Sequence, residues 1–352
     1  MSFYKSIVRP ILFRLPPETV HEIGIEFLKL GISGNASNSK FDFGPLTRFG
    51  LEFANPLGVA AGFDKNGVVV NQLASLGFGF VEVGTVTYDP QPGNPKPRLF
   101  RLPDDGALIN RLGFNNDGAE RITERLASIK RNCVVGVNIG RNKDVPNEEA
   151  TANYLRSFDL VHPVADYIAV NISSPNTPNL RDLQRAESLD GLLSPMQKRN
   201  RELGRKPLLV KIAPDLTEAE IEACVDVCQR YEIDGIIATN TTITRDGLKT
   251  ANVESTGAGG LSGKPLEKRS NEVISMIYKY SDGKLPIIGV GGIFTAEDAF
   301  AKIAAGASLL QAYTGFVYGG PSFPSDVNKG LFQILSDRGF STLDEAVGSA
   351  AR

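Results

Sequence analysis

The sequence predicts an α/β protein: a (β/α)8 barrel, or TIM barrel, with a small N-terminal helical extension. Short β-branched runs alternate with helical segments, as a parallel sheet closed by crossover helices requires. Eight such runs follow one another, and polar or glycine residues stand at their ends. With 352 residues, of which 41% are hydrophobic, the chain can form a barrel of about 250 residues and a small additional part.

The N-terminal part is predicted to be a pair of helices. The first, at about Tyr4 to Phe13, carries apolar residues at helical spacing, although Pro10 should kink or break it. The second begins at Pro17, which suits a first helical turn, and places its apolar side chains on one side.

A linker should separate this pair from the barrel. Residues 31–40 are rich in Gly, Ser and Asn, so we expect residues 1–38 to form the extension and residues 39–352 the barrel. The first 15 residues hold three basic and no acidic side chains. A helix that lies on an anionic membrane surface has this composition, and a helical hairpin packed on the barrel is the alternative.

The eight expected strands are residues 55–62, 80–85, 134–140, 167–173, 207–213, 235–240, 286–292 and 309–315. A helix is expected after each strand, and Thr295 could cap the helix after the seventh. After the second strand, the turn sequence Pro103-Asp104-Asp105-Gly106 predicts an inserted hairpin.

Composition argues against several classes of protein. The net charge of -2 provides no field for binding nucleic acid. Three cysteines form no disulfide framework, which indicates a reducing compartment. We expect Cys224 and Cys228 to be small core residues, and no metal site, because few other ligands are available. No apolar run approaches the 18 or so residues that span a bilayer.

Barrels of this kind carry their reactive groups at the carboxyl ends of the strands. The residues at these ends are Asp64, Lys65, Thr85, Asn138, Asn171, Lys211, Thr239, Asn240, Gly291, Gly292, Tyr313 and Thr314. One polar residue there is usually a solvated boundary or a helix cap. A whole ring is costly to bury without a ligand, so a bound polar ligand is predicted.

The glycines of GVGGIF, residues 289–294, narrow the type of ligand. Their backbone N–H groups can approach a ligand before a helix begins, where barrels commonly hold a phosphate. The run departs from GxGxxG at its last position, and AGGLSGKP has Ala258 where a P-loop needs Gly. A mononucleotide fits better than a dinucleotide or a nucleoside triphosphate.

Nine segments between Asn55 and Gly315 are similar, in order, to the signature segments of dihydroorotate dehydrogenases. They are NPLGVAAGFDKNG, GTVTYDPQPGNPKPRLFRL, INRLGFNN, NISSPNTPNLR, VKIAPDL, ATNTT, GGLSGKPL, IIGVGGI and QAYTGF. Ser174 and the N-terminal extension resemble the quinone-dependent class of bacterial type. The resemblance implies a flavoprotein that oxidises (S)-dihydroorotate to orotate on FMN, in pyrimidine biosynthesis, and passes electrons to a membrane quinone.

The resemblance also implies roles for individual residues. FMN would be held by Ala61, Gly62, Lys65, Thr85, Asn138, Asn171, Lys211, Thr239, Gly263, Gly292, Tyr313 and Thr314. The substrate would meet Lys65, Asn110, Arg111, Leu112, Gly113, Phe114, Asn171, Asn176, Asn240 and Thr241. Ser174 would be the base, with Thr177 and a water as its proton path, and His21, Arg101 and Tyr313 are candidates for the quinone site.

Three of these roles have a physical reason. A cation such as Lys211 near flavin N1 stabilises the anionic reduced ring. Asparagines offer both a donor and an acceptor, which matches a cyclic imide. A neutral serine is a poor base, so Ser174 needs a path for its proton.

The implied partners are dihydroorotate or orotate, a membrane quinone and the membrane surface, but no nucleic acid. The implied location is peripheral, on the cytoplasmic face of the inner membrane, and we expect a monomer. Two alternatives stay open: a soluble-class enzyme that reduces fumarate or serves NAD through a partner, and a flavin-binding protein without turnover. Ser174 and the extension argue against the first.

Overall fold

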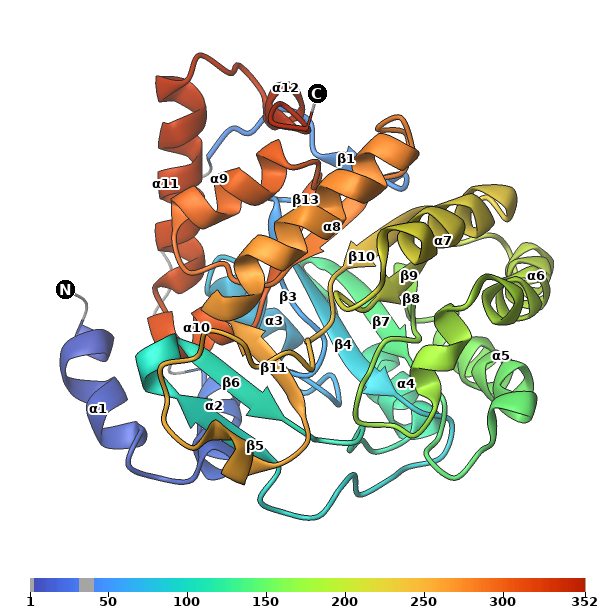
Figure 1. Ribbon diagram of the computed structural model, residues 1–352, viewed down its shortest axis with the longest axis horizontal. Helices are drawn as coiled ribbons and strands as arrows, with labels where there is room; N and C mark the ends of the chain where they lie inside the picture. Colours follow the sequence, from blue (N-terminus) through green and yellow to red (C-terminus); the bar gives the residue numbers. More distant parts are fainter. Residues whose placement is uncertain (1–2, 32–40, 352) are drawn as a thin grey trace.

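Figure 1 shows the computed structural model of the chain, which describes residues 3–31 and 41–351. A closed barrel lies at its centre, and the N-terminal helices lie beside a small separate sheet at one edge. The predicted boundary between residues 38 and 39, and all of the linker except Gly31, lie outside the described residues.

Eight parallel strands form the barrel, and the last pairs with the first. They are β3 (Leu57–Val59), β4 (Phe80–Val86), β7 (Val134–Ile139), β8 (Tyr167–Asn171), β9 (Leu208–Ile212), β10 (Gly235–Ala238), β12 (Ile287–Val290) and β13 (Leu309–Ala312). The predicted fold class and all eight predicted strands are confirmed. The strands are buried almost throughout, because helices cover the outer face and side chains fill the interior.

Helices surround the barrel on its outer face (Figure 1). They are α3 (Val70–Ser75), α4 (Ala119–Ser128), α5 (Ala150–Val161), α6 (Ala186–Glu202), α7 (Glu218–Arg230), α8 (Glu267–Tyr280), α9 (Ala296–Ala304), α10 (Thr314–Gly319), α11 (Phe323–Asp337) and α12 (Leu343–Ala346). Thr295 caps α9, as predicted, in a capping box with Asp298. Cys224 and Cys228 are buried in α7, which confirms them as core residues.

The predicted hairpin is present as β5 (Leu99–Leu102) and β6 (Ala107–Asn110). A third strand, β11 (Gly260–Gly263), pairs antiparallel with β6 and was not predicted, because its sequence GLSG lacks β-branched residues. A two-stranded ribbon, β1 (Thr47–Arg48) and β2 (Leu51–Glu52), precedes the barrel. The three-stranded sheet brings Asn110 and Gly263 to the edge of the cavity described below.

The N-terminal part consists of a π-helical turn (Tyr4–Val8), α1 (Arg9–Leu12) and α2 (Pro17–Lys29). The prediction of two helical segments is confirmed, and the first runs through Pro10 without a break: Val8 and Arg9 have helical φ and ψ, and a π-helical turn directly precedes the proline. The described residues in these segments, His21 among them, are half-buried or exposed. Across the described ranges, no helix is long and apolar enough to cross a bilayer.

The close packing of the barrel interior can be tested at Gly136 in β7. A Cβ there would lie 2.0 Å from Cζ of Tyr167, whose ring is fully buried. We expect Gly136→Ala to lower the free energy of unfolding by about 1–3 kcal/mol, because the ring cannot move without displacing its neighbours. Urea unfolding measures this. Gly191→Ala, on an exposed face of α6, is the control and should be neutral or stabilising; equal stability of both variants would contradict the packing.

Candidate active site at the barrel mouth

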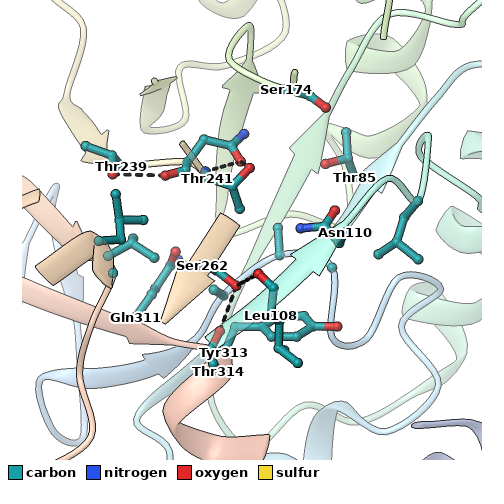
Figure 2. A pocket seen from close by; sticks show the side chains of 18 of the residues that line it. Thr85, Leu108, Asn110, Ser174, Thr239, Thr241, Ser262, Gln311, Tyr313 and Thr314 are labelled. Atoms are coloured by element: carbon teal, nitrogen blue, oxygen red, sulfur yellow. Dashed lines mark hydrogen bonds between the residues drawn. The ribbon is translucent and has the colours of Figure 1, made fainter. Parts of the chain in front are cut away.

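A cavity of about 1060 Å³, including its open mouth, lies at the carboxyl ends of the strands. Figure 2 shows side chains from the barrel strands, the hairpin and β11 around it. Of the predicted residues, those that line it are Ala61, Gly62, Lys65, Thr85, Asn110, Leu112, Gly113, Phe114, Asn171, Ser174, Asn176, Lys211, Thr239, Asn240, Thr241, Gly263, Gly292, Tyr313 and Thr314. The cavity therefore lies where the sequence placed the predicted ligand site, at the carboxyl ends of the strands.

The cavity floor is organised around Glu82, a fully buried carboxylate in β4. One oxygen accepts hydrogen bonds from Nδ2 of Asn138 at 2.9 Å and Nζ of Lys211 at 3.4 Å. The other accepts from Nε2 of Gln311 at 2.7 Å and the hydroxyl of Tyr167 at 3.0 Å. Lys211 is therefore a buried ion-paired cation whose side chain also borders the cavity.

A chain of amides and hydroxyls continues from the floor. Thr85 donates to Oδ1 of Asn138 at 2.6 Å, and Asn171 donates to Oγ1 of Thr85 at 2.9 Å. Asn240 donates to Oγ of Ser173 at 3.0 Å. Because each side chain holds the next, the amides that face the cavity have defined orientations.

One end of the cavity forms what we call the cradle, consisting of Ser262, Gly263, Gly291, Gly292 and Thr314. Gly263 and Gly292 have positive φ, and Cβ atoms there would lie 2.3 Å from the Gly106 carbonyl oxygen and 2.4 Å from Cβ of Glu267. The hydroxyls of Ser262 and Thr314 are 2.8 Å apart and lie side by side in Figure 2. Glycine backbone and two hydroxyls suit a phosphate group.

The opposite end contains Ser174 and the asparagines. Asn176 donates from Nδ2 to Oδ1 of Asn110 at 3.2 Å and from its backbone N–H to Oγ of Ser174 at 3.2 Å. Lys65 also lines the cavity, and burial lowers the pKa of its ammonium to about 8, while Glu18 acts in the opposite direction. An anionic substrate group beside Lys65 would favour the charged form.

Three predicted residues lie just outside this cavity. Asn138 lies behind Thr85 and Asn171 and supports them. Thr177 is buried, and its hydroxyl has no hydrogen-bond partner among the described residues. The guanidinium of Arg111 turns away, to the carbonyls of Thr256 and Ala258.

Several residues that line the cavity or lie beneath it were not predicted. Glu82 and Gln311 interrupt apolar strands, and such an interruption inside a barrel strand is the signal that could have identified them. Ser262 belongs to the unpredicted strand β11, and Asn115 lies in the loop after β6.

A second cavity, of about 1560 Å³ including its open mouth, lies between the N-terminal helices and the barrel. Its lining is mainly apolar, and it includes the three predicted residues His21, Arg101 and Tyr313. Burial lowers the pKa of His21 to about 3, with Lys65 acting in the same direction, so the imidazole is neutral near pH 7. Tyr313, Leu99 and Leu108 line both cavities and form the wall between them.

The fold and the site together define a TIM-barrel enzyme whose cavity suits a polar ligand with a phosphate group. The family model for dihydroorotate dehydrogenase matches residues 46–335, so the chain belongs to the dihydroorotate dehydrogenase family. This confirms the resemblance read from the nine segments. The family is one of flavin-dependent oxidoreductases.

Curated relatives match almost the whole chain. A protein of Christiangramia forsetii named dihydroorotate dehydrogenase (quinone) is 52% identical over 339 residues, which cover 94% of this chain and 99% of that protein. One of the same name from Mycobacterium tuberculosis is 47% identical, with 98% of each chain covered. The solved structure of DHODH from Eimeria tenella in complex with ferulenol matches with a TM-score of 0.91 at 37% identity, covering 97% and 99% of the two chains.

The ion pair at the floor leads to a stability prediction. Glu82→Ala leaves the ammonium of Lys211 buried without a counter-ion, so we expect a loss of about 3–5 kcal/mol in the free energy of unfolding. Denaturant unfolding of the variant measures this. Asp190→Ala, which breaks an exposed ion pair with Arg230 in α7, is the control and should cost less than about 1 kcal/mol. Similar losses in both would exclude a special role for Glu82.

Proposed function

We propose that this chain is a quinone-dependent dihydroorotate dehydrogenase that oxidises dihydroorotate to orotate with FMN and then reduces a membrane quinone. One observation carries the proposal: a polar cavity with a cradle and an apolar cavity beneath the N-terminal helices share the wall of Tyr313, Leu99 and Leu108. An enzyme that delivers electrons to a soluble acceptor has no need of the apolar cavity. Pyrimidine biosynthesis is the corresponding pathway.

FMN fits the polar cavity on the chemistry of its lining. The cradle can receive a single phosphate, since it offers glycine backbone with positive φ at Gly263 and Gly292 and the hydroxyls of Ser262 and Thr314. Lys211 and the amide chain suit the polar edge of a flavin ring. When bound, FMN supplies the acceptor for the hydride that leaves C6 of dihydroorotate.

The protein's own residues would bind and deprotonate the substrate. Lys65 would pair with the substrate carboxylate, and Asn110, Asn176 and Asn240 would hydrogen-bond the ring amides. Ser174 would take the proton from C5. The unpartnered hydroxyl of Thr177, in the same loop, supports a water-mediated path for that proton.

The N-terminal segments would deliver the quinone. Apolar side chains are exposed on them at Phe3, Ile7, Ile11, Leu15, Phe27 and Leu30. Together with the basic residues Lys5, Arg9 and Arg14, this surface suits an anionic bilayer. We therefore propose a monomer held peripherally on the cytoplasmic face of the inner membrane, with His21 and Arg101 near the quinone.

Ser174→Ala tests the chemical step. The variant should retain FMN, but dihydroorotate should bleach its yellow colour about 100-fold or more slowly, because general-base catalysis is lost. Anaerobic stopped-flow absorbance measures the rate, and the flavin content measured on the same sample is the control. Unchanged bleaching would remove Ser174 as the base, and a yellow wild-type protein that never bleaches would refute the function.

Gly24→Phe tests the apolar cavity. Gly24 lies in α2 and lines this cavity, and a Cβ added there would meet no other atom within 4 Å, so a phenyl group would occupy the space. Bleaching by dihydroorotate should be normal, whereas reoxidation by a long-chain quinone should slow about tenfold, as about 1.4 kcal/mol of lost binding would produce. Gly191→Phe, at an exposed helical glycine, is the matched control. Equal reoxidation in both variants would contradict entry through this cavity.

A further inference from the structure

Lys302 in α9 is a fully buried lysine outside the two cavities. Its ammonium donates to Oγ of Ser270 at 2.9 Å and to Oδ1 of Asn271 at 2.7 Å, and both partners are neutral. Burial lowers its pKa to about 7, while Glu267 and Asp298 act in the opposite direction. A buried cation with neutral partners is destabilising, so its presence needs a reason.

The ammonium of Lys302 lies behind the cradle. Ser270, which accepts its hydrogen bond, donates to the carbonyl of Val290 at 2.7 Å. Val290 and the two glycines that follow it line the polar cavity. Two hydrogen bonds therefore connect the ammonium to the cavity wall. The stem of Lys302 fits against β12 only because residue 289 is glycine, where a Cβ would lie 2.6 Å from Cδ of the lysine.

The neighbouring carboxylates are already paired with another cation. Lys264 forms ion pairs with Glu267 at 2.7 Å and with Asp298 at 2.6 Å. Lys302, by contrast, has no carboxylate within ion-pair distance among the described residues. Its charge is therefore available to a further anion.

The cradle itself lacks a cationic side chain. Among the described residues that line the polar cavity, the lysines are Lys65 and Lys211, and Lys211 is paired with Glu82. Ser262, Thr314 and the glycines can donate hydrogen bonds to a phosphate but carry no charge. Through a buried, poorly screened wall, a cation behind the cradle acts over a longer distance than it would in water.

We propose that Lys302 is a positioning residue for the FMN phosphate: its buried ammonium stabilises the phosphate dianion through the wall of the cradle without touching it. This inference rests on the proposed function, because it requires FMN as the ligand. Coupling is reciprocal, so the bound phosphate must raise the pKa of Lys302 and draw a proton to it. The affinity for the phosphate is then greatest while Lys302 is protonated and falls as the pH rises through the pKa in the complex.

Lys302→Met tests this with apoprotein, FMN and riboflavin, which has the same ring system but no phosphate. Fluorescence titration at pH 7 should show the preference for FMN over riboflavin reduced about fivefold in the variant, with riboflavin affinity unchanged. This is the effect of about one pKa unit of coupling on a group with a pKa of about 7. Between pH 7 and 9 the preference should decline in the wild type and stay flat in the variant. Lys206→Met is the control, because the Lys206 ammonium bonds carbonyls at a site remote from the cradle.

Proton uptake provides a measurement that does not depend on riboflavin. Calorimetry in two buffers at pH 7.5 should show wild-type apoprotein taking up protons when FMN binds and Lys302→Met taking up fewer. Equal uptake, or equal loss of FMN and riboflavin affinity, would overturn the role of Lys302. A wild-type preference for FMN over riboflavin that does not change between pH 7 and 9 would also overturn the role of Lys302. Apoprotein that binds neither flavin would instead refute the proposed function.

Discussion

The buried carboxylate of Glu82 is the constraint on which the site depends. An ionised group in the middle of a barrel must be satisfied by donors, and here they come from β7, β8, β9 and β13. Each donor is thereby held in one orientation. Lys211 consequently presents its ammonium at the floor of the polar cavity, and Asn138 supports Thr85 and Asn171 from behind. The internal layer of the barrel thus determines the chemistry of the surface above it.

The N-terminal part is attached by polar contacts and by limited apolar packing, such as that of Phe13 on Tyr318, and it leaves apolar surface exposed. Glu18 pairs with Arg98 at 2.7 Å, and Tyr4 donates to the carbonyl of Val317 at 2.8 Å. Helices held in this way can cover an apolar cavity without filling it. Glu18 also acts electrostatically on Lys65, so the attachment of α2 and the charge at the substrate end are linked.

The sequence predicted the barrel because burial on both faces requires β-branched runs, and these were recognisable at all eight strands. It also predicted the residues of the polar cavity that end barrel strands, whereas Asn110, Asn176 and Gly263 followed from the resemblance to the family. It did not predict β11, whose pairing depends on the neighbouring hairpin rather than on its own residues. Arg111 was placed with the substrate residues, and this role stays a prediction; its guanidinium donates to carbonyls of the distant segment at 256–258, which the sequence did not predict. Lys302 was not singled out in the sequence, because its burial depends on Gly289 in another element.

The three lysines in or behind the polar cavity differ in which groups compensate their charge, and this difference separates their roles. Lys211 has a carboxylate partner in the protein, so the floor can remain charged and ordered before any ligand enters. Lys65 has acidic neighbours but no direct ion pair among the described residues, so its charge suits an anionic substrate that binds and dissociates in each turnover. Lys302 has neutral partners alone and lies behind a cradle of glycines. The charge of such a cation is compensated only when an anion occupies the cradle, so the cation strengthens binding of that anion. Tight binding suits a resident cofactor better than a substrate that is released in each turnover.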